Sequence, residues 1–320
     1  MIEENIKILV TGATGQIGSE LIPELRKKYG NDNIVAVGHK TKPSDELLNS
    51  GPFEYIDTTN KDALRAIIEK YNIKIIYHLV SLLSATGEKN PDLAWSINMN
   101  GLKNVLDLAR ICKIERIFWP SSIAAFGPET PRENTPNETI LRPTTMYGIT
   151  KVAGELLCEY YFKNYDLDIR CLRYPGIISH KTLPGGGTTD YAVAIFYQAI
   201  KDKKYTCFVR KDTVLPMMYM PDCIKATVDI MEADGSKFNH RCFNLTAMSF
   251  SVEDLAAEIK KHIPEFECDY EPDFRQEIAD SWPKTIDESA AREEWGWKSD
   301  YDLSRMTEKM LDEIKQKKVV

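Results

Sequence analysis

Tyr147 and Lys151 are the first residues whose types and spacing suggest chemistry. They stand four positions apart in the run Y-G-I-T-K, and residues at this spacing share one face of a helix. A nearby ammonium favours the ionised form of a phenol, so the pair can supply a general base near neutral pH. The hydroxyls of Ser121 and Ser122, at the end of the preceding predicted strand, can hold the oxygen that reacts. The same spacing also occurs in ordinary amphipathic helices, so this chemistry needs a second motif.

A glycine-rich turn near the N-terminus is that second motif. Gly12, Gly15 and Gly18 follow a predicted strand and open a predicted helix in the run T-G-A-T-G-Q-I-G. Glycines permit the tight turn and let the backbone approach a pyrophosphate, whose charge meets the free N–H groups of the helix. The turn therefore indicates a dinucleotide, and the positive charge of an oxidised nicotinamide would further favour the ionised phenol. The cofactor-binding residues expected here are Thr11, Gly12, Gly15, Gln16, Ile17 and Gly18.

Composition argues against several other classes of protein. The net charge of -7 disfavours nucleic acid or an anionic membrane as a partner, because both bind basic patches. No apolar run reaches the roughly 18 residues of a membrane span. The acidic start at Met1–Asn5 does not resemble a signal or transit peptide, so we expect a cytoplasmic protein. The seven cysteines and five histidines are scattered without a C-x-x-C pair, so we expect no metal site.

The elements that must position these residues alternate along the first half of the chain. Apolar runs predict strands at 6–11, 34–38, 73–79, 115–121 and 169–174, with helices at 17–29, 62–71, 91–112 and 145–164. This alternation is typical of an α/β fold with a doubly wound parallel sheet of the Rossmann type. Later residues predict helices at 190–201, 221–232 and 255–262 and a short strand at 242–245. We expect an NAD-binding domain of residues 1–174 plus about 221–247, and a smaller C-terminal substrate-binding lobe of residues 175–220 and 248–320.

Together these motifs resemble the extended short-chain dehydrogenase/reductase superfamily. Asn98-x-x-Gly101-x-x-Asn104 is similar to its helix signature, and Arg173-Tyr174-Pro175-Gly176 to its segment beside the nicotinamide. The resemblance implies Ser122, Tyr147 and Lys151 as catalytic residues; it selects Ser122 over Ser121 because Ser122 lies five residues before Gly127. It also implies an adenine contact from Asp57 and further cofactor contacts from Leu79, Val80, Ser81, Asn98, Tyr147, Lys151, Tyr174, Gly176 and Ile177.

Longer runs resemble one family within that superfamily, the short-chain-type L-threonine 3-dehydrogenases. These runs are 120–128, 142–148, 184–192, 215–222 and 279–283. The resemblance implies NAD-dependent, metal-independent oxidation of L-threonine at Cβ to 2-amino-3-oxobutyrate, a step of threonine catabolism. It also implies a homodimer formed by the helices at 91–112 and 145–164, and functional coupling to 2-amino-3-oxobutyrate CoA ligase.

An amino-acid substrate must have its carboxylate, ammonium and hydroxyl held at once. The run 187–190 at a helix start offers N–H groups and hydroxyls to a carboxylate, with Asp190 as a partner for the ammonium. On residue types alone, Thr189 and Asp190 serve equally well to cap the helix. The resemblance adds Thr188, Ser84 and Trp282. The expected substrate contacts are therefore Ser84, Ser121, Ser122, Tyr147, Thr188, Asp190 and Trp282.

One position departs from the pattern of NAD-specific enzymes. These usually carry an acid at the end of the second strand for the ribose 2′-OH, whereas this chain reads Val37-Gly38-His39-Lys40. We expect NAD as the cofactor with NADP usable, because a basic loop alone is a weak signal. Two alternatives stay open. One is a nucleotide-sugar epimerase or dehydratase of the same superfamily, which would need cationic residues for a diphosphate. The other is a non-catalytic NAD(P) sensor, which would not need Tyr147 and Lys151.

Overall fold

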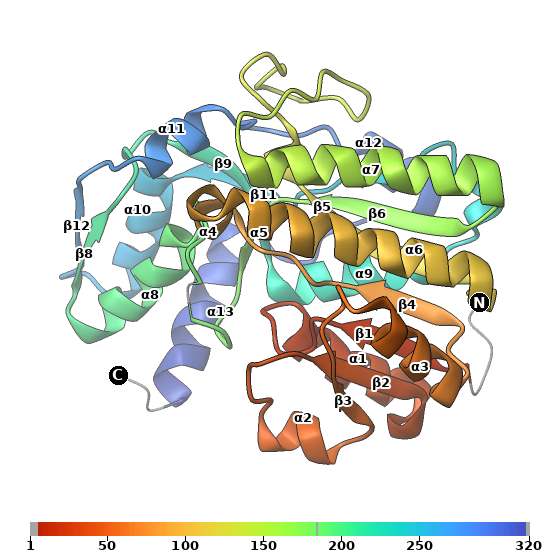
Figure 1. Cartoon of the computed structure of the whole chain (residues 1–320). Coiled ribbons are helices and arrows are strands. Elements are labelled where there is room, and N and C mark those ends of the chain that lie inside the picture. The colour runs from red at the N-terminus through yellow and green to blue at the C-terminus, as the bar shows by residue number, and fades with distance from the viewer. Residues whose placement is uncertain (1–5, 184, 318–320) are drawn as a thin grey trace.

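A seven-stranded parallel sheet forms the centre of the computed structural model, which describes residues 6–183 and 185–317 (Figure 1). The strand order is β10-β6-β5-β4-β1-β2-β3, and all neighbouring pairs are parallel. The order reverses between β1 and β4, where Rossmann folds open a crevice for nucleotides. The predicted fold class is confirmed. The strands are β1 (Ile8–Thr11), β2 (Ile34–Gly38), β3 (Phe53–Tyr55), β4 (Ile75–His78), β5 (Arg116–Ser122), β6 (Asp168–Tyr174) and β10 (Cys242–Asn244).

Helices cover both faces of this sheet. Alternate residues of a strand point to opposite faces, so Ile8 and Val10 of β1 pack with one helical layer and Leu9 packs with the other. Burial on both faces explains why the strands read as continuous apolar runs. One layer contains α1 (Gly18–Tyr29), α9 (Met220–Glu232) and α12 (Ser289–Trp295). The opposite layer contains α3 (Lys61–Tyr71), α6 (Gly101–Cys112) and α7 (Met146–Tyr165).

A second group of elements lies at one side of the sheet, to the left in Figure 1. It has its own apolar core and two small sheets, ordered β11-β9-β7 and β12-β8. Its strands are β7 (Gly176–Ile178), β8 (Lys204–Cys207), β9 (Val214–Tyr219), β11 (Met248–Ser251) and β12 (Glu267–Tyr270). Its helices are α8 (Tyr191–Lys201), α10 (Val252–His262), α11 (Arg275–Asp280) and α13 (Leu303–Gln316).

Several elements differ from the sequence prediction. The segment 91–112 is not one α-helix: α5 (Pro91–Trp95) is followed by a π-helical turn (Ser96–Asn100) and then by α6. π-helical turns often mark functional sites, and this one borders a cavity described below. The strands β3, β7, β8, β9, β11 and β12, and the short helices α2 (Asp45–Asn49), α4 (Ser84–Lys89), α11 and α12, were not predicted.

The acidic start Met1–Asn5, and Pro184 of the run 184–192, lie outside the described residues. None of the helices within 6–183 and 185–317 is long and apolar enough to cross a membrane.

Candidate active site

The glycine-rich turn joins β1 to α1 in a shape that fits a pyrophosphate. Gly12 has a φ of +74°, and a Cβ there would lie 3.1 Å from the backbone of Leu79 and Val80. A Cβ at Gly18 would lie 2.2 Å from the carbonyl oxygen of Gly12, so only glycine lets α1 begin this close to the turn. Ile17 at the N-cap offers no side-chain hydrogen bond to α1. The N–H groups of Ser19 and Glu20 donate to the carbonyls of Gly15 and Ile17, so an anion would meet the N–H groups that precede them at the turn.

A cavity of about 580 Å³ extends from this turn to the end of β2. It is bordered by Gly12 and Gly15 at one end and by Asp57 at the other. The side chain and the backbone N–H of Thr59 both donate to Oδ1 of Asp57, at 2.7 and 2.9 Å, and these hydrogen bonds lower the pKa of that carboxyl. The shape and the donor set fit the adenosine and pyrophosphate of a dinucleotide. The other lining residues include Gly38, His39, Lys40, Thr41, Leu79, Val80, Ser81, Ser96 and Ile97.

Two expected cofactor residues turn their polar groups away from this cavity. The hydroxyl of Thr11 lies 2.7 Å from Nδ1 of His78, beneath the turn. Burial, and then the charge of Lys151, lower the pKa of His78 to about 3, so this imidazole is neutral. Asn98 hydrogen-bonds both backbone groups of Leu82 and donates to Thr150 of α7. Its amide thus positions the loop after β4 and does not face the cavity.

Ser122, Tyr147 and Lys151 line a second cavity of about 160 Å³. Leu79 and Ser81 border both cavities, so the two are neighbours. The start of α7 is fixed by Thr145, whose hydroxyl accepts from the N–H of Gly148 at 3.1 Å. The expected residues Gln16, Ile17, Tyr174, Gly176, Ile177, Ser84, Ser121, Thr188, Asp190 and Trp282 also line this cavity.

The pKa of Tyr147 differs from the sequence-based expectation. Burial raises it to about 12, and the neighbouring hydroxyls of Ser122 and Ser81 oppose that rise. Lys151 was expected to depress this pKa, but its Nζ donates to the carbonyl of Pro120 at 2.7 Å and lies 5.3 Å from the centre of the Tyr147 ring. Burial also lowers the pKa of Lys151, to about 8. The chain's own groups therefore do not depress the pKa of the phenol by themselves.

The two adjacent serines have different environments. Ser122 lines the cavity, and its Oγ accepts from the N–H of Ala124 at 3.2 Å. The hydroxyl of Ser121 is buried and donates instead to the carboxylate of Glu155. Strand alternation turns the Ser121 hydroxyl away from that of Ser122, and the expected substrate contact from Ser121, which also lines the cavity, stays a prediction.

Thr188 and Asp190 share a loop but have different surroundings. The side chain of Thr188 is buried, and within the described part of the chain its hydroxyl has no hydrogen-bond partner. A buried hydroxyl without a partner is costly, so its position in the cavity wall suits a ligand. The carboxylate of Asp190 accepts from the N–H groups of Gly186 and Gly187, each at 2.7 Å. Asp190 therefore stabilises the conformation of the loop. Because its carboxylate already accepts two hydrogen bonds, it is less available to a substrate ammonium.

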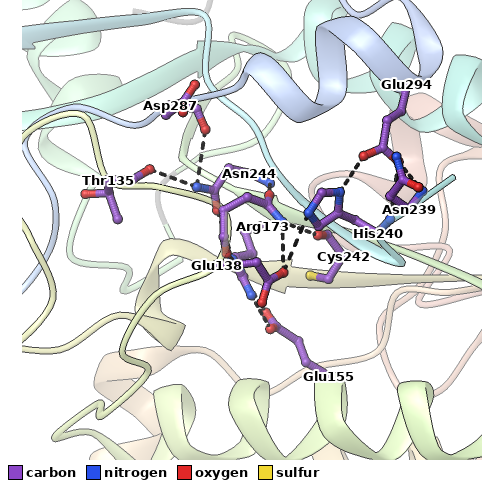
Figure 2. Close-up of polar contacts among 11 residues, drawn as sticks. Thr135, Glu138, Glu155, Arg173, Asn239, His240, Cys242, Asn244, Asp287 and Glu294 are labelled. Carbon is purple, nitrogen blue, oxygen red and sulfur yellow. Dashed lines mark hydrogen bonds and ion pairs between the residues drawn. The ribbon is translucent and has the colours of Figure 1, made fainter.

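A buried ion pair behind the catalytic helix was not predicted. Arg173 of β6 donates from Nε and Nη2 to the two carboxylate oxygens of Glu155, at 2.9 and 2.8 Å (Figure 2). Nη1 of the same guanidinium donates to the Asn137 carbonyl and to Oδ1 of Asn244, so the pair joins α7, β6 and β10. Glu155 follows Lys151 by four residues, and that spacing is the signal that could have identified it.

No cluster of three or more metal-ligating side chains suited to an ion occurs within residues 6–183 and 185–317. Metal-independent activity stays a prediction.

Comparisons with known proteins agree with this geometry. The family model of the NAD dependent epimerase/dehydratase family matches residues 8–245. An uncharacterized epimerase/dehydratase from Staphylococcus haemolyticus is 52% identical over 97% of this chain and 98% of its own length. The X-ray structure of L-threonine dehydrogenase from Clostridium difficile is 49% identical with a TM-score of 0.96, over 99% of this chain and 100% of that one. A monomeric L-threonine 3-dehydrogenase from a metagenome is 48% identical with a TM-score of 0.92, over 97% and 99%.

These matches confirm the resemblance to L-threonine 3-dehydrogenases that the motifs predicted. They also support a nicotinamide cofactor for the glycine-rich turn. The chain belongs to the NAD dependent epimerase/dehydratase family.

Proposed function

We propose that this chain is an NAD-dependent L-threonine 3-dehydrogenase that oxidises the Cβ hydroxyl of L-threonine to a ketone, giving 2-amino-3-oxobutyrate. The main observation is the unpartnered hydroxyl of Thr188 in the wall of the cavity that holds Tyr147 and Lys151. That cavity measures about 160 Å³, below the roughly 300–1,000 Å³ of pockets for larger ligands. A small amino acid suits it better than a nucleotide-sugar.

The reaction removes a proton from the substrate oxygen and a hydride from Cβ. Tyr147 accepts the proton, and Ser122 orients the oxygen by a hydrogen bond from its hydroxyl. Lys151 would hold the cofactor's ribose, and its charge together with that of a bound oxidised nicotinamide would oppose the burial that raises the pKa of Tyr147. Bound NAD⁺ supplies the hydride acceptor, while the protein contributes position and electrostatics.

Several residues would hold the amino acid during this step. The N–H group and the hydroxyl of Thr188 suit the carboxylate. Trp282, which is almost fully buried, presents an apolar wall for the γ-methyl. Ser84 adds a hydroxyl to the same wall. Selection of a single methyl by an apolar wall is modest, so L-serine should be a poorer substrate but not an inert one.

The proposal also includes the wider properties that the family resemblance implies. Residues 1–174 with about 221–247 would form the cofactor domain, and residues 175–220 with 248–320 the substrate lobe. The enzyme would act in the cytoplasm without a metal ion, and its product would pass to 2-amino-3-oxobutyrate CoA ligase. A homodimer would form through the exposed apolar side chains of α6 and α7, such as Ile111 and Leu156.

Reduction of NAD⁺ followed at 340 nm, with L-threonine, L-serine and a UDP-sugar as substrates, tests this function. L-Threonine should give reduced cofactor, and activity should persist with a chelator. Tyr147→Phe should lower kcat by about a hundredfold or more with cofactor affinity nearly intact, because only the proton acceptor is lost. Turnover of the UDP-sugar alone would favour an epimerase or dehydratase. Cofactor binding with no turnover of any substrate would favour a sensor.

A further inference from the structure

The end of β2 lacks the acid that usually selects NAD over NADP. Gly38 is the last residue of this strand, and it borders the cofactor cavity. A Cβ at Gly38 would lie 2.8 Å from Cζ and 3.3 Å from Cε1 of Phe53. The ring of Phe53 therefore occupies the space where an acidic side chain would begin. Restoring the acid by Gly38→Asp alone would require this ring to move.

The next three residues of the loop place an imidazole, an ammonium and a hydroxyl at the same end of the cavity. His39, Lys40 and Thr41 all line it beside Gly38. Nε2 of His39 lies 3.9 Å from Oδ2 of Asp57, and both side chains are about half exposed. Among the described residues, Lys40 has neither an ion-pair nor a hydrogen-bond partner in this protein. Its ammonium is free to meet a ligand.

The only carboxylate that borders this end of the cavity within the described residues is already engaged. Oδ1 of Asp57 accepts two hydrogen bonds from Thr59, and Oδ2 faces His39. The hydrogen bonds from Thr59 contribute most to the lowered pKa of Asp57, and the nearby His39 and Lys40 contribute less. A dianionic phosphate would therefore meet the Lys40 ammonium and the His39 imidazole at this end of the cavity, against one carboxylate.

We propose that His39, Lys40 and Thr41 form a subsite for the 2′-phosphate of an adenosine ribose, so that this chain binds NADP⁺ as well as NAD⁺. Because Gly38 carries no carboxylate, the 2′-OH of NAD⁺ gains no hydrogen bond at this position, and the 2′-phosphate of NADP⁺ meets no repulsion there. The inference rests on the proposed function only in assuming that the cavity takes a nicotinamide dinucleotide. We expect dissociation constants for the two cofactors within about tenfold of each other, the effect of one charge-assisted contact.

Calorimetric titration of the whole protein with NAD⁺ and NADP⁺ tests this without any turnover. Lys40→Met and His39→Gln should each weaken NADP⁺ by about three- to tenfold, as expected for exposed charge contacts, and change NAD⁺ by less than about twofold. Lys42→Met is the matched control, because Lys42 is an exposed lysine of the same loop that does not line the cavity. It should change neither affinity. Added salt should weaken NADP⁺ more than NAD⁺.

The outcomes separate the inference from the function. If NAD⁺ binds while NADP⁺ binds about a hundredfold or more weakly, the phosphate subsite is absent and the dehydrogenase proposal stands. If NADP⁺ binds well but Lys40→Met and His39→Gln leave it unchanged, other residues hold the phosphate and the assignment is wrong. If neither dinucleotide binds, the inference and the proposed function fail together.

Discussion

At the scale of single residues, the buried ammonium of Lys151 lowers the stability of the folded protein. Burial lowers its pKa to about 8, below the roughly 10.4 of a free lysine, so the unfolded chain binds this proton more tightly. The buried ammonium therefore costs stability below pH 8, and the cost fades as the pH rises from 8 toward 10.4. Unfolding by urea at several pH values should show the wild type gaining up to roughly 3 kcal/mol over Lys151→Met across this window.

The test compares the free energies of unfolding of the wild type and of Lys151→Met at each pH. All other titratable groups are present in both proteins, so their contributions cancel in this difference. A pH-independent difference would contradict the depressed pKa of Lys151.

Lys151→Met should also lower cofactor affinity as well as kcat, in contrast to Tyr147→Phe.

Thr188 permits a second test at this scale. Its buried hydroxyl has no partner among the described residues, so Thr188→Val should leave the free energy of unfolding unchanged or raise it. The KM for L-threonine should rise by about tenfold or more, because a hydrogen bond to the carboxylate is lost. Thr188→Ser should restore most of the lost affinity.

Thr307 of α13 supplies the matched control. Its hydroxyl is likewise buried and unpartnered in the described chain, but Thr307 does not line the cavity. Thr307→Val should have the same effect on stability and none on KM. An unchanged KM in Thr188→Val would remove Thr188 from the substrate site.

At the scale of elements, the ion pair of Glu155 and Arg173 joins β6 to α7, the helix that carries Tyr147. Removing one partner leaves the other charge buried, so Glu155→Gln should cost about 3–5 kcal/mol of stability. The double variant Glu155→Gln/Arg173→Met should cost less than the single one, because no uncompensated charge remains. A double-mutant cycle measured by urea unfolding gives the coupling. Additive effects would show that the pair is not coupled.

Elements with local signals could be predicted from the sequence, and those set by tertiary contacts could not. The sequence could predict that Ser122, Tyr147 and Lys151 lie together, because short motifs place them at the end of a strand and on one helix face, and all three line one cavity. Strand β9 was missed because Pro216, which cannot donate to a ladder, lies inside it. The environment of Ser121 depends on Glu155, 34 residues away, which no local pattern reveals. The raised pKa of Tyr147 follows from burial and likewise needs the folded protein.

At the scale of the whole molecule, α6 and α7 lie side by side on one face of the sheet (Figure 1). Three large apolar side chains are exposed on these helices: Ile111 is 51% exposed, Leu156 63% and Tyr160 51%. Large exposed apolar patches often mark protein interfaces, and Leu156 and Tyr160 share one face of α7 because they are four residues apart. This surface suits a symmetric pair of copies of the chain.

A charge in this patch should separate the copies without unfolding them. Light scattering coupled to gel filtration should give the mass of two chains for the wild type and of one chain for Leu156→Lys, since a buried unpaired ammonium is costly at an interface. Phe274→Lys is the matched control, because Phe274 is 56% exposed but belongs to the N-cap of α11, outside this surface. A wild type with the mass of one chain, like the similar monomeric enzyme, would overturn the dimer. A dimer that persists in Leu156→Lys would place the interface elsewhere.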